Sequence, residues 1–271
     1  MAKAANGNGA RLAAEQLDEV LRLSKRADSV ELKLIVPMAA QRDALRVLRK
    51  LGLDPVEAQP RQVFFFDTPG LELSKAGVVV RARRIQGGTA DTVVKLRPVE
   101  PDDLDKDLRR SGAFKVEVDV VPGGFVCSGS LRGQCSGKEV LEALAEGGSL
   151  RSIFSKEQRA FYKAHAPKDI KLDSLTVFGP TFVLKSKVRP KDFDERALTV
   201  ELWLYPDGTR NLEISTKCTP DVAIQEGNEL RAYLSNNGIQ IAGGQTTKTK
   251  AAMDYFVGEM KAGRKRVEHR N

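Results

Sequence analysis

Six segments of the chain alternate between apolar and charged residues, and this alternation limits what the chain can fold into more than any other feature. They lie at residues 29–36, 77–85, 91–99, 114–121, 197–205 and 210–217. Successive side chains of a strand point to opposite faces, so each segment predicts a strand with one apolar face and one face that carries charges. A half-exposed sheet with a solvated outer face would explain any one of these strands.

The two signs of charge are unevenly distributed among these strands. Bases gather on residues 77–85 and 91–99, whereas acids gather on 29–36, 114–121 and 210–217. An antiparallel sheet that closes into a barrel would turn all of these faces inward and leave a wet, charged tunnel. Because the strands are mostly spaced as hairpins, with helices between and after them, we predict an α+β fold. It is an antiparallel eight-stranded β-barrel tunnel, closed or nearly closed, with flanking helices.

The remaining elements follow from periodicity and turn residues. Further strands are predicted at 62–67, 170–178 and 181–189, and helices at 11–27, 38–50, 137–146, 154–163, 220–237 and 248–262. The charged stretch 100–113 and the Gly/Ser-rich stretch between Cys127 and Cys135 are predicted as loops.

The composition argues against several classes of protein. The 271 residues include two histidines and three cysteines, with no Cys-x-x-Cys or His-Glu-x-x-His motif. A zinc site of thiols or histidines, a disulfide scaffold and a Ser-His-Asp hydrolase are therefore poorly supported. No apolar run approaches the roughly 20 residues of a membrane helix, and no signal-peptide core is visible, so we expect a cytoplasmic protein without a membrane partner. The net charge of +8 favours an anionic partner.

The charges that would face inward predict what the tunnel binds. A polyanion would be held by Lys33, Arg81, Arg83, Lys95 and Arg97. A divalent cation would be held by Glu31, Glu117, Asp119, Glu201 and Glu213. Carboxylate oxygens suit Mg²⁺ or Mn²⁺, which also bind phosphate oxygens. A basic wall that faces an acidic, metal-binding wall is what phosphoryl transfer from a triphosphate requires.

These residues fall in motifs that resemble the CYTH domain, or triphosphate tunnel metalloenzymes, a superfamily of class IV adenylate cyclases, thiamine triphosphatases and inorganic triphosphatases. The segment Ser29-Val30-Glu31-Leu32-Lys33 resembles the family's opening Glu-x-Glu-x-Lys strand. The next signature is matched by Phe66-Asp67-Thr68-Pro69, Leu73 to Gly77 and Arg81-Ala82-Arg83, and later elements by Lys95, Lys115 to Asp119 and Glu213. The resemblance runs from about residue 29 to 257. It divides the chain into an N-terminal tail and helix (1–28), a CYTH domain (29–260) and a basic tail (261–271).

The resemblance also implies roles for individual residues. Glu31 and Lys33 are expected to be catalytic. Phosphate binding is expected of Lys33, Arg81, Arg83, Lys95, Arg97, Arg159 and Lys248, and binding of Mg²⁺ or Mn²⁺ of Glu31, Glu117, Asp119 and Glu213.

Two departures from the family pattern weaken the acidic wall. Ser29 stands where the family has its first Glu, and Ser215 stands where a second late acid is common. A neutral hydroxyl is a poor substitute for a charged oxygen ligand on Mg²⁺.

The resemblance implies a metal-dependent hydrolase that cleaves a triphosphate phosphoanhydride, with inorganic triphosphate as the simplest substrate. Two alternatives stay open: a class IV-type adenylate cyclase, and a catalytically weakened protein that binds triphosphate or polyphosphate. Nucleic acid is an unlikely partner, because the tunnel and the tail account for most of the charge surplus. A homodimer is compatible with the sequence.

Overall fold

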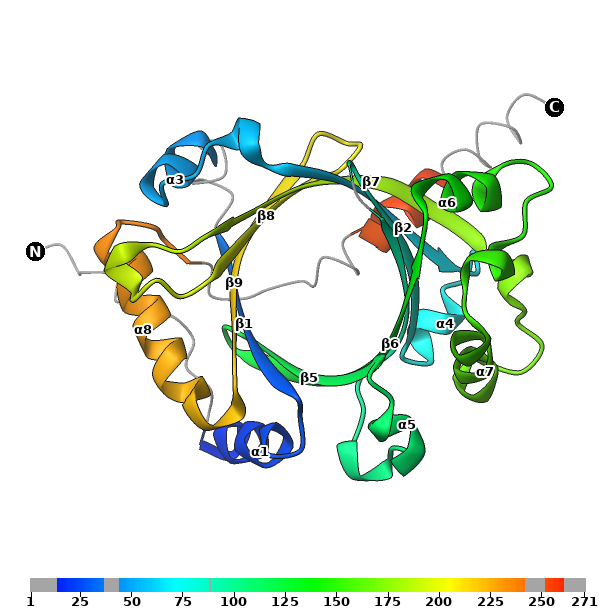
Figure 1. The fold of residues 1–271 in the computed structure, drawn as a ribbon, viewed down its shortest axis with the longest axis horizontal. Coiled ribbons are helices and arrows are strands. Elements are labelled where there is room, and N and C mark those ends of the chain that lie inside the picture. Colours follow the sequence, from blue (N-terminus) through cyan, green and yellow to red (C-terminus); the bar gives the residue numbers. More distant parts are fainter. Residues whose placement is uncertain (1–13, 37–43, 88, 242–251, 261–271) are drawn as a thin grey trace, which may run out of the picture.

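The computed structural model describes residues 14–36, 44–87, 89–241 and 252–260, and within them nine strands form a closed barrel (Figure 1). The strands are β1 (Ser29–Val36), β2 (Gln59–Asp67), β3 (Val78–Ile85), β4 (Ala90–Leu96), β5 (Phe114–Val121), β6 (Gly124–Cys135), β7 (Thr176–Val188), β8 (Leu198–Leu204) and β9 (Arg210–Cys218). Around the barrel they follow the order β1-β5-β6-β4-β3-β2-β7-β8-β9. The predicted α+β barrel is confirmed, but it has nine strands where eight were predicted, and one pair, β1 with β5, is parallel.

The additional strand is β6, which includes the Gly/Ser-rich stretch that was predicted as a loop. The glycines of this strand allow neighbouring side chains to pack closely against its backbone. A Cβ atom added to Gly129 would lie 2.7 Å from Cζ of Phe114, and one added to Gly133 would lie 2.3 Å from Oε1 of Gln158. Glycine inside a strand often marks such a close approach by a neighbour. The loop prediction was wrong because it treated these glycines as turn residues.

The strands predicted at 170–178 and 181–189 form a single long strand, β7, which starts at Thr176. Its register against β2 shifts between Val63 and Phe65. A Cβ atom on Gly179 would lie 2.8 Å from the carbonyl oxygen of Val63, so this position requires glycine. Part of the first predicted segment is instead a short 3₁₀ turn, Leu172–Ser174.

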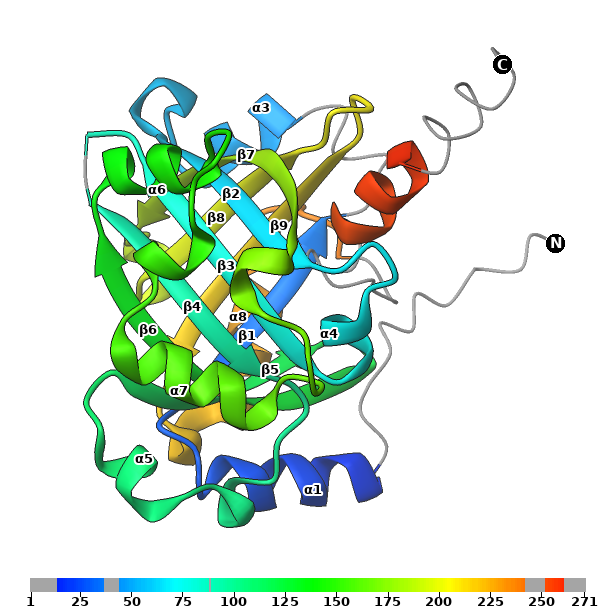
Figure 2. The same cartoon turned by 90° about the vertical axis from the view of Figure 1, so that its right-hand side faces the viewer.

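Seven of the described helices lie outside the barrel wall (Figures 1 and 2): α1 (Ala14–Ser24), α3 (Ala44–Lys50), α4 (Glu72–Lys75), α5 (Lys106–Arg110), α6 (Gly137–Leu144), α7 (Lys156–His165) and α8 (Ala223–Asn236). A further helix at residues 252–260 instead packs against residues of the inner face, among them Val63, Phe65 and Trp203. The stretch 100–113, predicted as a loop, contains a 3₁₀ turn and α5. The outer parts of the helices predicted at 11–27, 38–50 and 248–262 lie outside the described residues. Within the described ranges, no helix has both the length and the apolar character needed to cross a membrane.

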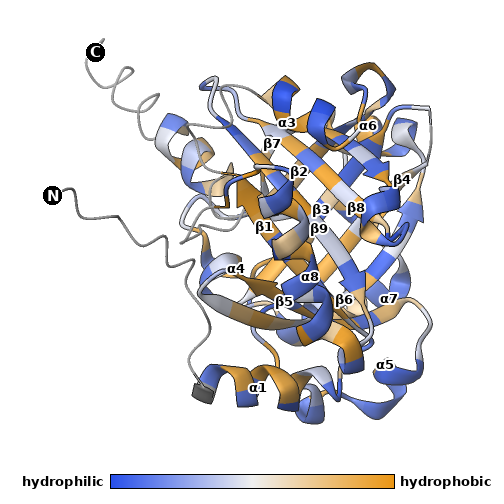
Figure 3. Ribbon diagram, turned by 90° about the vertical axis from the view of Figure 1, so that its left-hand side faces the viewer, coloured by the Kyte–Doolittle hydropathy of each residue, from blue (hydrophilic) through white to orange (hydrophobic). Residues whose placement is uncertain are grey.

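The main hydrophobic core lies between the barrel wall and these helices, not inside the barrel. On β1, the side chains of Val30, Leu32, Leu34 and Val36 are buried in this outer core. Helices contribute buried residues from their inner faces, among them Leu230 of α8. Figure 3 shows hydrophobic and hydrophilic residues alternating along the strands. The alternation therefore sends apolar side chains outward under the helices and charged ones into the barrel.

Candidate functional site

A cavity of about 990 Å³ occupies the barrel and is lined by residues of all nine strands. Its described lining carries nine basic and six acidic side chains. The basic ones are Lys33, Arg61, Arg81, Arg83, Lys95, Arg97, Arg132, Lys185 and Lys217, and the acidic ones are Glu31, Asp91, Glu117, Asp119, Glu201 and Glu213. An enclosed cavity with a surplus of cations focuses a positive potential and favours an anionic ligand.

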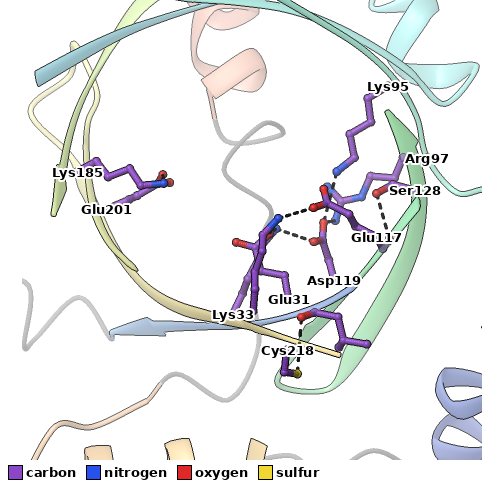
Figure 4. A network of polar contacts seen from close by, with 12 residues as sticks. Glu31, Lys33, Lys95, Arg97, Glu117, Asp119, Ser128, Lys185, Glu201 and Cys218 are labelled. Atoms are coloured by element: carbon purple, nitrogen blue, oxygen red, sulfur yellow. Dashed lines mark hydrogen bonds and ion pairs between the residues drawn. The ribbon is translucent and has the colours of Figure 1, made fainter. Parts of the chain in front are cut away.

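Asp119 on β5 lies at the centre of the largest group of charges (Figure 4). Its side chain is only 2% exposed, and its Oδ1 accepts a hydrogen bond of 2.7 Å from Nζ of Lys33 on β1. Nζ of Lys95 on β4 and Nη2 of Arg97, just after the end of β4, lie 3.6 and 3.7 Å from Oδ2. That oxygen is buried without a hydrogen-bond partner. One carboxylate therefore holds three cationic side chains in place.

The pKa values of this group show how strongly its charges are coupled. Burial favours protonation of Asp119, but Lys33 and Lys95 outweigh it and hold the pKa of Asp119 well below its usual range. Burial likewise disfavours the charged form of Lys33, yet Asp119 and Glu31 raise its pKa above the usual lysine value. Lys95 behaves in the opposite way, because burial and the charges of Lys33 and Arg97 exceed the effect of Asp119 and lower its pKa to about 8. Lys95 can therefore change charge near neutral pH.

A second group of charges joins β5 to β9 across β1. Nζ of Lys217 forms an ion pair with Glu117 and lies 3.8 Å from Oε2 of Glu31. Glu117 also pairs with Arg132 of β6 at 3.1 Å. Although burial opposes it, the charge and hydrogen bond of Lys217 lower the pKa of Glu117. The carboxylates of this region therefore all have basic partners.

Further bases lie elsewhere on the wall. On β3, Arg83 pairs with Asp91 of β4, while Arg81 lies 4.0 Å from the same carboxylate. Burial, together with the nearby charge of Arg83, lowers the pKa of Arg81 to about 10, and its Nε is buried without a hydrogen-bond partner. Across the barrel, Lys185 lies 3.5 Å from Glu201 (Figure 4). Cations therefore face the cavity from several sides.

Part of the lining is apolar and is packed against the helix at residues 252–260. Val63, Phe65 and Trp203 line the cavity and belong to a small buried cluster that includes Met253 of this helix. Nε1 of Trp203 donates a hydrogen bond of 3.2 Å to Glu201. Trp203 is therefore a packed part of the wall.

The segment Phe66-Asp67-Thr68-Pro69 fixes the start of β3 in the barrel wall, but its residues do not line the cavity. The carboxylate of Asp67 is fully buried and accepts hydrogen bonds from the backbone N–H groups of Thr68, Leu73 and Ser74, which fixes the turn into α4. A Cβ on Gly77 would then lie 2.7 Å from the carbonyl oxygen of Arg97, so only glycine fits there. This local structure starts β3 in the register that turns Arg81 and Arg83 inward.

Most of the predicted site residues come together. Glu31, Lys33, Arg81, Arg83, Lys95, Arg97, Glu117, Asp119 and Glu213 all line the cavity, while Lys248 lies outside the described residues. The prediction omitted Arg61, Arg132 and Lys185, and it gave no role to Asp91 or Lys217. Each is separated by an even number of positions from another lining residue of its own strand, so the alternation alone could have identified them.

Arg159 does not line the cavity, contrary to its predicted role in the tunnel. It lies on α7, outside the barrel, and its Nη1 donates a hydrogen bond of 2.5 Å to the carbonyl oxygen of Phe154. The buried residues of α7 are Gln158, Phe161 and Tyr162, and Nε2 of Gln158 donates to the carbonyl oxygens of Thr92 and Leu131 in the wall. Sequence position alone could not predict which side chains of α7 would face the barrel.

The carboxylates of the tunnel do not form a ready site for a divalent cation. Within the described ranges, no three acidic, histidine or cysteine side chains come together in a way that could hold a metal ion. Glu31, Glu117 and Asp119 each form ion pairs with basic side chains. Ser29 lies opposite Glu117 in the register of β1 and β5, and Ser215 lies opposite Lys33, so neither position supplies a charged oxygen. The expected binding of Mg²⁺ or Mn²⁺ thus finds no assembled set of ligands.

Comparison with known proteins identifies solved structures with a similar fold. No protein-family model and no curated protein matches the sequence. Among solved structures, HpAC1 from Hippeastrum, a candidate adenylyl cyclase described as having a dominant triphosphatase activity, shares 15% identity at a TM-score of 0.61, over 83% of this chain and 94% of its own. A candidate adenylate cyclase from Bacillus halodurans, bh2851, shares 14% identity at a TM-score of 0.57, over 82% and 96%. The chain has the fold of these proteins, which supports the CYTH resemblance at the level of the fold.

Proposed function

We propose that the barrel binds the triphosphate group of a small molecule and hydrolyses one of its phosphoanhydride bonds, with inorganic triphosphate as the simplest substrate. The observation that carries this proposal is the set of nine basic side chains that face one cavity. Ammonium and guanidinium groups form strong, charge-assisted hydrogen bonds with phosphate oxygens. The triphosphatase activity attributed to HpAC1, a protein of the same fold, agrees with it.

The geometry suggests how the residues divide the task. Lys33, Lys95 and Arg97, held around Asp119, would bind one part of the triphosphate, and Arg81 and Arg83 would bind another. Before the ligand arrives, Asp119 and Asp91 keep these bases apart and oriented. Such preorganised cations neutralise the charge that develops on the phosphoryl and leaving oxygens.

Glu31 and Lys33 would act on the reacting atoms. Their side chains lie 3.2 Å apart on the same face of β1. Water attacks the terminal phosphorus, a new P–O bond forms and the bridging P–O bond breaks. The proton of the water passes to the carboxylate of Glu31, and Lys33 neutralises the oxygen that leaves with the pyrophosphate. No step is assigned to a metal, because the carboxylates do not form a site for one.

One observation favours a second candidate, a protein that binds triphosphate with little turnover. The acids that would orient water, Glu31, Glu117 and Asp119, are all engaged in ion pairs. An adenylate cyclase is the third candidate, because the ribose 3′-hydroxyl of ATP could take the place of water. The names of HpAC1 and bh2851 are its support.

The test is release of phosphate and pyrophosphate from inorganic triphosphate and from ATP, each with Mg²⁺, with Mn²⁺ or with EDTA, together with an assay for cyclic AMP. We expect phosphate release from inorganic triphosphate that is lost in Arg81→Ala and in Glu31→Ala. Arg159→Ala removes an arginine outside the cavity and serves as the matched control. Tight binding of triphosphate without release would favour the binding protein, and cyclic AMP from ATP would favour the cyclase. Failure to bind any triphosphate would refute all three.

A further inference from the structure

The acidic residues of the tunnel are accompanied by a cation that belongs to the chain itself. β1 lies between β5 and β9, and Glu31 is opposite Asp119 on one side and Lys217 on the other. Nζ of Lys217 forms an ion pair with Glu117 and approaches Oε2 of Glu31 to 3.8 Å. One ammonium group thus bridges carboxylates of two strands, which is a position that a divalent cation shared by these carboxylates would also take.

The charges around this point disfavour an additional cation. Glu31, Glu117 and Asp119 are ion-paired with five basic side chains: Lys33, Lys95, Arg97, Arg132 and Lys217. The group already has an excess of positive charge before any metal arrives. These bases would repel an added cation, most strongly around Asp119, whose side chain is 2% exposed and where burial lowers the effective dielectric constant, so the same group favours an anion.

The remaining possible ligands do not reverse this balance: Glu213, which also lines the cavity and acts on Lys33, adds a fourth carboxylate against the five bases. Mg²⁺ requires nearly octahedral oxygen ligands and releases its water reluctantly. Ser29 and Ser215 would supply only neutral hydroxyls where carboxylates would be needed. Lys217 itself follows Ser215 by two positions, so it lies on the same face of β9 as Glu213 and Ser215.

We infer that the ammonium group of Lys217 takes the place of a divalent cation between Glu31 and Glu117, so that the tunnel binds its triphosphate ligand without a metal. The part that concerns the ligand rests on the proposed function. The part that concerns the cation does not, because it can be measured on the protein without any triphosphate.

The experiment is a titration of the full chain with Mn²⁺ alone, followed by electron paramagnetic resonance or calorimetry. The control is Lys163→Glu, which makes the same change of charge as Lys217→Glu but at an exposed lysine of α7. We expect the wild type to bind Mn²⁺ no better than this control. Lys217→Glu should bind Mn²⁺ at least about tenfold more tightly, because it adds a carboxylate and removes the competing cation. Stoichiometric, tight binding of Mn²⁺ by the wild type would overturn the inference. Equal affinity of Lys217→Glu and Lys163→Glu for Mn²⁺ would overturn it as well.

Two further measurements keep the test decisive. Because Lys217→Glu places three carboxylates together, Lys217→Gln is measured beside it, with circular dichroism to check folding, and should also bind Mn²⁺ more tightly than the wild type. Binding of inorganic triphosphate to the wild type should be equal within about twofold in EDTA and in Mg²⁺ once the Mg²⁺ bound by free ligand is accounted for. Triphosphate binding that is lost in EDTA would refute the inference while leaving the proposed function intact. Absence of triphosphate binding under every condition would refute the proposed function, and the Mn²⁺ titration would still decide on Lys217.

Discussion

Replacing Asp119 by Asn should destabilise the protein and at the same time increase the stabilisation that bound triphosphate provides. The carboxylate is 2% exposed and lies within 3.7 Å of Lys33, Lys95 and Arg97. Without its charge, these three partly buried cations repel one another, and only Lys33 keeps a carboxylate partner, Glu31. Removal of one partner from a buried ion pair typically costs about 3–5 kcal/mol, and we expect a loss of about this size in the free energy of unfolding.

The effect should depend on pH in a definite direction. The pKa of Asp119 is well below its usual range in the folded state. A carboxyl whose pKa is lowered on folding contributes stability that is fully present above its unfolded value of about 4, and this stability is lost as the pH falls through the folded value. The difference between wild type and Asp119→Asn should therefore be full at neutral pH and should shrink on acidification below about pH 4.

Chemical denaturation, repeated with and without inorganic triphosphate, tests this reasoning. The ligand should restore more stability to Asp119→Asn than to the wild type, because in the variant it does not compete with a resident carboxylate for the three cations. A ligand present at 100 times its Kd stabilises a protein by about 2.7 kcal/mol, which sets the scale of the shift. Asp107→Asn, at an exposed ion pair with Arg110, is the control and should change stability by less than about 1 kcal/mol. Equal destabilisation by both variants, or a smaller response of Asp119→Asn to triphosphate, would refute the argument.

Three further outcomes are expected. Because the pKa of Lys95 is lowered to about 8, the affinity for triphosphate should fall above pH 8 by up to about tenfold per pH unit. Calorimetry should show that the affinity falls more steeply above pH 8 in the wild type than in Lys95→Arg, because the arginine stays charged. Gly129→Ala should lose about 1–3 kcal/mol of unfolding free energy because its Cβ would lie 2.7 Å from Phe114. Gly124→Ala on the same strand, whose nearest neighbour would be 4.0 Å away, should be close to neutral. Gln158→Ala should lose about 2–4 kcal/mol in urea denaturation because it leaves Thr92 and Leu131 without their buried partner, and an unchanged midpoint would contradict this role.

The inward and outward faces of the strands could be read from the sequence because alternation is a local property. Lys33, Arg81 and Asp119 were assigned to the tunnel from the period of two residues in their strands alone, and all three line it. Strand β6 was missed for an equally local reason. Its glycines and serines have low strand propensity, and their value becomes visible only when the ring of Phe114 and the amide of Gln158 are in place.

The pairing of charges could not be read from the sequence because it depends on which strands become neighbours. Lys217 and Glu117 are 100 positions apart, and they meet only because β1 lies between β5 and β9. The parallel pair β1–β5 sets this arrangement, and a sequence of hairpins does not predict it. Arg159 shows the same limit for helices, because the direction of a side chain on α7 depends on how the helix packs against β4 and β6.

Equilibrium binding of inorganic triphosphate to the wild-type chain tests the central claim most directly. The account predicts one site per chain, with affinity that falls at least about tenfold in Arg81→Ala and in Lys33→Ala, since each removes a charge-assisted bond to phosphate. The affinity should be unchanged in Arg159→Ala, whose guanidinium bonds to the Phe154 carbonyl outside the barrel. Absence of binding, or binding that Arg159→Ala weakens while Arg81→Ala and Lys33→Ala do not, would contradict the claim that the barrel cavity is a triphosphate site.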